Sequence, residues 1–255
     1  MIQDILLPMV CERFRCDGRY RDGHLRVINA LPARKVLGLH TPEMKRVALA
    51  LSRNDAVGYI RAFEEYRHDK LTYEETVIWG FLINKVKSPF GERLEMLDRY
   101  VPVLDNWAVC DSFCANAKWM AKADKELLWN YIQKWFVSRR EFEVRFAVVT
   151  AMCCFISEEW IDKVFAAIDK IDFDVIASSY ISAKGKPSVA QSGTVQGAAP
   201  YYVRMAVAWL LATALSKLPD ATRGYVNVSR LPSDVIKMYV RKARESFRTR
   251  HISAL

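Results

Sequence analysis

Histidine is scarce in this sequence, and its cysteines lack the spacing of a metal site. The chain has 4 histidines and 6 cysteines in 255 residues, and the cysteines stand at positions 11, 16, 110, 114, 153 and 154. Neither a Cys-x-x-Cys motif nor a pair of histidines accompanies Cys110 and Cys114, as a structural zinc site would need. We therefore expect reduced cysteines in an intracellular protein, with no metal and no cofactor.

Long apolar runs and nucleotide-binding loops are also missing. Residues 1–16 alternate apolar and charged side chains too quickly for a signal peptide, and the longest apolar run, residues 146–156, is too short to span a bilayer. No glycine-rich phosphate loop and no Ser/His/Asp set is present. The sequence thus predicts a soluble cytoplasmic protein and gives little support to a kinase, a serine hydrolase or a metalloenzyme.

Acidic residues are outnumbered by basic ones. The chain has 38 Lys and Arg against 29 Asp and Glu, a formal net charge of +9. The excess is strongest between Arg230 and Arg250, where seven basic residues stand against Asp234 and Glu245. Such an excess favours a phosphate backbone as the partner, although a solvated basic face is the simpler alternative.

Apolar residues, 51% of the chain, recur every three or four positions, and no segment shows the alternation of a strand. This pattern predicts one helix after another. We expect helix breaks at eight places, several of which contain capping residues: 38–42, 53–55, 69–72, 88–91, 102–105, 138–141, 157–159 and Pro219. Short connectors between helices of about 12 to 17 residues indicate stacked antiparallel pairs, in a bundle or a solenoid.

A local repeat favours the solenoid. Residues 144–148 and 203–207 share the pattern Val-Arg-x-Ala-Val, in which small Ala and branched Val permit close packing while Arg extends out of the seam. Stacked repeats build a curved wall, and a basic concave face would hold a DNA duplex. We expect a single helical-repeat domain over residues 1–255.

One segment differs from the rest. Residues 178–199 are rich in Ser, Gly, Ala and Gln and contain Lys184 and Lys186. This composition predicts a long flexible loop. The loop could close over a ligand, or it could be a tolerated surface insertion.

Two aromatic segments contain the candidate chemistry. In residues 105–111, Asp-Asn-Trp-Ala-Val-Cys-Asp, a helical register places Trp107 and Asp111 on one side, one turn apart. A carboxylate beside an indole ring suits a site for a developing cation. The second segment, residues 201–209, ends in Trp209. Both tryptophans could instead be core residues.

These motifs together resemble the AlkD-type DNA alkylation repair family, the HEAT-like-repeat DNA glycosylases. The resemblance rests on Val36-Leu37-Gly38-Leu39-His40-Thr41-Pro42-Glu43-Met44-Lys45-Arg46, Asn106-Trp107 to Asp111, Val144-Arg145, and Tyr201-Tyr202-Val203-Arg204 to Trp209. It implies an all-α HEAT-like solenoid with a concave basic face. It also implies hydrolysis of the N-glycosidic bond of cationic N3- or N7-alkylated purines in duplex DNA, without base flipping, as a step of base excision repair.

The resemblance assigns roles to four residues. Asp111 corresponds to the catalytic carboxylate, Trp107 and Trp209 to the rings that flank the deoxyribose of the lesion, and Arg145 to a clamp on the DNA backbone. Without the resemblance, Asp111 could cap a helix or form an ion pair with Lys118, and Arg145 could form an ion pair with Glu141. From the basic segments we expect further DNA contacts, made by Arg204, Lys184, Lys186, Arg241 and Lys242.

Other functions stay open at this point. The surroundings of Asp111, Cys110-Asp111-Ser112-Phe113-Cys114, and the spacer at 178–199 depart from the founding enzymes. A non-catalytic binder of distorted or branched DNA and a helical-repeat scaffold for a partner protein are the alternatives. The resemblance implies a bacterial, nucleoid-associated protein whose partner is double-stranded DNA with alkylated bases. We expect a monomer that does not bind membranes.

Overall fold

The structure is a computed structural model that describes residues 2–31, 33–178, 181–183, 186–188 and 200–255. Over these residues it contains fourteen α-helices, three 3-10 helices and one pair of three-residue strands. The all-α class is thereby confirmed. The chain divides into two compact units, Met1–Trp119 with Ala183–Val189 and Met120–Ser182 with Ala190–Leu255, and each is described by itself. The single domain and its concave face stay predictions.

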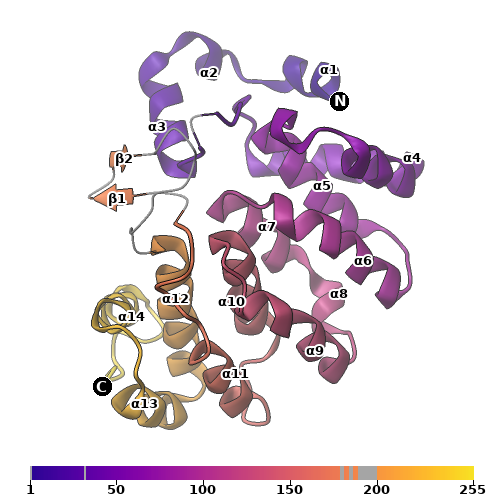
Figure 1. Ribbon diagram of the computed structural model, residues 1–255. Helices are drawn as coiled ribbons and strands as arrows, with labels where there is room; N and C mark the ends of the chain where they lie inside the picture. The colour runs from indigo at the N-terminus through magenta and orange to yellow at the C-terminus, as the bar shows by residue number, and fades with distance from the viewer. Residues whose placement is uncertain (1, 32, 179–180, 184–185, 189–199) are drawn as a thin grey trace. The chain divides into compact units, whose positions relative to one another are not determined.

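The first unit is built from short N-terminal helices followed by longer ones (Figure 1). Its elements are α1 (Gln3–Leu6), η1 (Leu7–Met9), α2 (Glu12–Cys16), α3 (Gly18–Ile28), α4 (Thr41–Glu65), η2 (His68–Lys70), α5 (Tyr73–Lys85), α6 (Phe90–Tyr100), η3 (Val101–Val103) and α7 (Trp107–Asn116). Helix α8 (Lys118–Ala121) lies at the boundary between the units in the sequence.

The second unit contains the remaining helices. They are α9 (Lys125–Phe136), α10 (Glu141–Cys154), α11 (Ile161–Ile168), α12 (Tyr201–Lys217), α13 (Pro219–Val228) and α14 (Ser233–Glu245). The strands β1 (Ile181–Ala183) and β2 (Lys186–Ser188) pair within the segment 178–199. The rest of the predicted flexible loop, 179–180, 184–185 and 189–199, lies outside the described residues.

The expected helix breaks are confirmed. Seven fall between α-helices or at the first residues of one, and the eighth is a kink inside α4, where Asp55 has φ −153° and ψ 81°. Capping chemistry explains how the helices begin. At α5 the Thr72 hydroxyl accepts from the Glu75 amide at 3.2 Å, and the Glu75 carboxylate accepts from the Thr72 amide at 2.9 Å. This reciprocal pair satisfies two amides that the helix itself leaves unbonded.

Close packing in the first unit places α7 against α5. Gly80, in the middle of α5, lies beside the ring of Tyr100 and the ring of Phe113 on α7. A Cβ at Gly80 would come within 2.3 Å of the Tyr100 hydroxyl oxygen. That hydroxyl donates to the Thr76 carbonyl of α5 at 3.3 Å. Glycine is therefore required for the Tyr100 ring at the end of α6 to lie this close to α5.

The repeated Val-Arg-x-Ala-Val pattern marks the seam between α10 and α12 in the second unit. The valines and alanines of both copies have no exposed surface: Val144, Ala147, Val148, Val203, Ala206 and Val207. Arg145 behaves differently from the expectation, because it does not extend out of the seam. Its side chain is only 3% exposed and lies within the packed interface.

Within the described ranges, no helix is long and apolar enough to cross a membrane. The same residues include no group of three or more His, Cys, Asp or Glu placed to hold a metal ion.

Candidate nucleic-acid interface

Trp107 and Asp111 lie one turn apart on α7, in the first unit, and both are half-buried. Ala115, one turn further along, is exposed, so this side of the helix faces solvent at its C-terminal end. The opposite face of α7 packs into the core through Val109, Cys110, Phe113 and Cys114. The register predicted from the sequence is therefore present.

The beginning of α7 is held by Asn106, which is 1% exposed. Its Oδ1 accepts from the Ala108 amide at 2.8 Å, which caps the helix, and its Nδ2 donates to the Ile28 carbonyl at 2.8 Å. Ile28 is the last residue of α3, and Asn29 after it has the left-handed φ of 53° that ends that helix. One buried amide side chain thus joins the end of α3 to the start of α7.

An ion pair beside the cap also fixes this segment. The Arg34 guanidinium contacts the Asp105 carboxylate at 2.6 Å and donates to the carbonyl oxygens of His68 and Leu71 at 3.2 and 2.8 Å. Burial raises the pKa of Asp105, and Arg34 opposes that rise. Because its carboxylate is bound to Arg34, Asp105 has a structural role rather than a catalytic one.

The other end of α7 is anchored by Asn84 of α5. Its Nδ2 donates to the Phe113 carbonyl at 3.0 Å, and its Oδ1 accepts from the Trp119 indole nitrogen at 2.9 Å. Both ends of α7 are therefore tied to neighbouring elements by buried or partly buried side chains. A helix anchored in this way presents Trp107 and Asp111 in a fixed geometry, as a catalytic or binding site needs.

In the second unit, Trp209 lies at a groove instead of in the core. Its side chain on α12 is 38% exposed. The groove has a volume of about 400 Å³ and is also lined by Lys242 of α14 and by Arg248 in the turn after it. Thr213 and Ser216 of α12 border it as well. The structure therefore brings together two predicted site residues, Trp209 and Lys242.

The charges at this groove are partly compensated by Glu245. That carboxylate lies 2.8 Å from Arg241, whose side chain is 80% exposed, and 3.5 Å from Lys242. Arg248 is exposed and has no carboxylate within ion-pair distance among the residues that the structure describes. Sequence reasoning counted Arg248 in the basic C-terminal segment but did not assign it to the site. Its place beside Trp209 depends on the turn that follows α14.

Two residues that were predicted to contact DNA, Arg145 and Arg204, bond to other residues of the protein. Arg145 Nη1 donates to the Tyr202 carbonyl at 2.7 Å, and Arg204 Nη1 contacts the Asp234 carboxylate at 2.6 Å with only 12% of its side chain exposed. These bonds join α10 to α12 and α12 to α14. A role for either arginine in holding DNA stays a prediction. Lys184 lies outside the described residues, and Lys186 belongs to β2.

Comparison with known proteins gave one family match. A family model described as DNA alkylation repair enzyme matches residues 24–172, more than half of the chain. The matched range includes Trp107, Asp111 and Arg145, whereas Trp209 and the groove around it follow it in the sequence. The comparisons with curated proteins and with solved structures gave no match.

Proposed function

Because the chain belongs to the DNA alkylation repair enzyme family, we propose that it is a DNA glycosylase for alkylated purines in duplex DNA. The observation that carries the proposal is the pair formed by Trp107 and Asp111 on the accessible side of α7, a helix held at both ends. This pair lies within the residues that the family model matches. The proposed product is an abasic site.

The chemistry needs little from the protein beyond a carboxylate. Alkylation at N3 or N7 makes the purine cationic, so the electrons of the breaking C1′–N9 bond neutralise the base, which leaves without a general acid. Positive charge then develops on the sugar. Asp111 would stabilise that charge, orient a water molecule toward C1′ and accept its proton. Because these steps occur at the sugar, the base need not be flipped into a pocket.

The indole ring of Trp107 would add attraction to the cationic nucleoside. A cation over an indole face contributes about 0.5 to 2 kcal/mol, depending on desolvation. Trp107 stands beside Asp111 on α7, and the exposed Trp209 offers a second ring at its groove. We propose that Trp107 contacts the lesion nucleoside and that Trp209 contacts DNA at its own groove in the second unit.

Backbone contacts are best assigned to the groove of the second unit. Lys242 and Arg248 line it, and the exposed Arg241 is the neighbour of Lys242 on α14. Basic side chains at the surface bind phosphate without reading the base sequence. Arg145 and Arg204 bond to other residues of the protein. This supports assigning the phosphate contacts to Arg241, Lys242 and Arg248.

One observation favours a second candidate function. Arg145, the expected clamp on the backbone, is buried and bonded to Tyr202. A chain that lacks this clamp could bind distorted or branched DNA without excising bases. Such a binder would show salt-dependent affinity that does not depend on Asp111.

Base release from alkylated DNA separates the two functions. Duplex DNA treated with a methylating agent is incubated with the protein, and free N7-methylguanine and N3-methyladenine are measured by chromatography. The glycosylase releases one or both bases and leaves sites that alkali cleaves. Tight binding without release of either base would establish the non-catalytic binder instead.

A further inference from the structure

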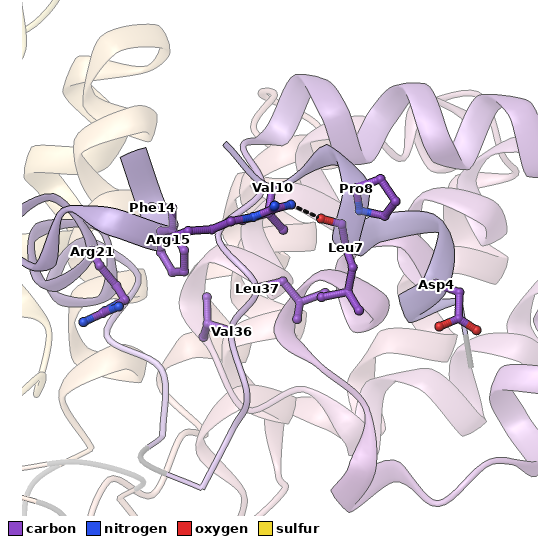
Figure 2. A pocket seen from close by; sticks show the side chains of 9 residues that line it. All are labelled: Asp4, Leu7, Pro8, Val10, Phe14, Arg15, Arg21, Val36 and Leu37. Atoms are coloured by element: carbon purple, nitrogen blue, oxygen red, sulfur yellow. Dashed lines mark hydrogen bonds between the residues drawn. The ribbon is translucent and has the colours of Figure 1, made fainter. Parts of the chain in front are cut away.

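A second cavity lies in the first unit, among its N-terminal helices, and the glycosylase proposal leaves it unused. It has a volume of about 650 Å³ and is bounded by α1, η1, α2, α3 and the extended residues that precede α4. Figure 2 shows Arg21 at one end and Asp4 at the other, with Val36 and Leu37 between them. Most of its lining is apolar and comes from Leu7, Pro8, Val10, Val36 and Leu37.

The walls of this cavity are held in place by the protein's own contacts. The buried Glu74 carboxylate accepts from the amides of Leu37 and Gly38 at 2.9 and 2.7 Å. Gly38 has φ +97°, and a Cβ there would collide with the Phe14 ring. Across the cavity the Arg15 guanidinium donates to the Leu7 carbonyl (Figure 2). A preformed cavity loses less conformational entropy when it binds a partner than a flexible surface does.

The lining suits a protein segment better than nucleic acid. Leu7 is 45% exposed and its neighbour Ile5 46%, so aliphatic surface is open to solvent. Phe14, the aromatic residue in the lining, is only 6% exposed, so its ring offers no face on which a base could stack. Placing phosphates over aliphatic side chains would cost desolvation without a compensating hydrogen bond. An apolar side chain would instead bury itself there favourably.

The charges at the cavity indicate what else the partner contains. Arg15 and Arg21 line it and are exposed, and Arg19 is exposed on the same helix as Arg21. The one lining carboxylate, Asp4, lies at the far end from Arg21 (Figure 2). Complementary charge fixes the orientation of a bound segment and speeds its association.

We propose that this cavity is a docking site for an acidic, apolar peptide segment of a partner protein. Apolar side chains of the segment would lie over Leu7, Pro8 and Val36, and its carboxylates would pair with Arg15 and Arg21. This inference does not depend on the glycosylase activity, because every residue involved lies outside the segments assigned to the DNA site.

The test uses a fluorescein-labelled peptide of about 12 residues, with Leu at helical spacing and Glu between. Fluorescence anisotropy with the full chain should give saturable binding with a Kd of roughly 10 to 100 µM, as expected for a small transient interface. Peptides with Lys in place of Glu, or Ser in place of Leu, should bind about tenfold more weakly. R21Q and Leu7→Ser should weaken binding of the Glu–Leu peptide by a similar factor, whereas R19Q should leave it unchanged.

Several results would overturn the proposal. The Glu–Leu peptide could fail to saturate, or it could bind no better than the Ser-substituted peptide. Equal effects of R19Q and R21Q would show nonspecific attraction instead of a site. Duplex DNA is measured in parallel: loss of DNA affinity in R21Q, with peptide binding intact, would assign the arginines to nucleic acid. Failure of base excision in the same preparations would leave the peptide result unaffected.

Discussion

Arg145 and Tyr202 contact each other twice across the seam between α10 and α12. The guanidinium donates to the Tyr202 carbonyl at 2.7 Å and lies 5.8 Å from the centre of the Tyr202 ring. The Tyr202 amide donates to the Glu141 carboxylate at 2.7 Å, so α10 holds both backbone groups of this residue. The first turn of α12, the helix that carries Trp209, is fixed by these bonds.

Arg145→Gln should therefore lower stability more than it changes DNA chemistry. The variant removes a hydrogen bond from a charged donor to the Tyr202 carbonyl and the packing of a 3% exposed residue, so we expect a loss of about 2 to 4 kcal/mol in the free energy of unfolding. Chemical denaturation monitored by circular dichroism measures it. The exposed Arg139→Gln is the control and should stay within about 0.5 kcal/mol of the wild type. A stable Arg145→Gln protein with lost DNA affinity would instead identify the backbone clamp.

Glu74 organises the segment before α4. Its carboxylate accepts from the amides of Leu37, Gly38 and Leu39 at distances between 2.7 and 3.3 Å. Glu74→Gln puts an amide group where the site offers only donors, so we expect a loss of about 2 to 4 kcal/mol in the free energy of unfolding. Urea denaturation checks this against the exposed Glu95→Gln. Equal stability of the two variants would show that the buried carboxylate contributes little.

Stability should fall in mild acid because of His24. Burial lowers the pKa of His24 below its ordinary value of 6.5, and His40, whose ring lies 5.4 Å away, adds to this effect. The unfolded chain then binds more protons than the folded protein as the pH falls through 6.5. The stabilising contribution of neutral His24 is thus present above that pH and lost below it.

Melting temperatures measured between neutral pH and mild acid test this. The wild type should melt progressively lower as the pH falls, and His24→Gln should show a smaller decrease because its side chain does not titrate. The exposed His251→Gln serves as the control and should follow the wild type. A steeper decrease of the melting temperature in His24→Gln than in the wild type would contradict the prediction that His24 destabilises the folded protein in acid.

The groove beside Trp209 can be tested with two arginines from the same region. Arg248 lines the groove, whereas Arg244 lines a separate cavity formed by α14 and the C-terminal residue. If the groove holds a phosphate, Arg248→Gln should weaken duplex binding about tenfold and reduce the salt dependence by about one phosphate contact. Arg244→Gln should change both quantities much less. Identical effects of the two would indicate a general field of positive charge.

The sequence predicted local features better than long-range contacts. Thr72 and Pro219 mark the first turns of α5 and α13. Capping by a hydroxyl and the missing N–H of proline act over only a few residues, so the sequence alone reveals them. The one-turn spacing of Trp107 and Asp111 also follows from helix geometry alone. These predictions needed no knowledge of the neighbouring helices.

Contacts between segments that are distant in the sequence could not be predicted from local patterns. Arg145 bonds to a carbonyl 57 residues away, so its burial depends on how α12 packs rather than on its own neighbours in the chain. Likewise, the exposure of Trp209 results from the placement of α14 and the turn after it. The cavity at Leu7 is formed by segments about thirty residues apart, and apolar periodicity does not reveal it.

The most direct test of the account is single-turnover excision of N7-methylguanine from a defined duplex by the wild type and by Asp111→Asn. Enzyme is in excess, DNA affinity is measured on the same proteins, and the exposed Asp162→Asn is the control. We predict that Asp111→Asn lowers the excision rate about 100-fold or more while affinity is retained, and that the control excises like the wild type. Equal excision by Asp111→Asn and the wild type would contradict the assignment of Asp111 as the catalytic carboxylate.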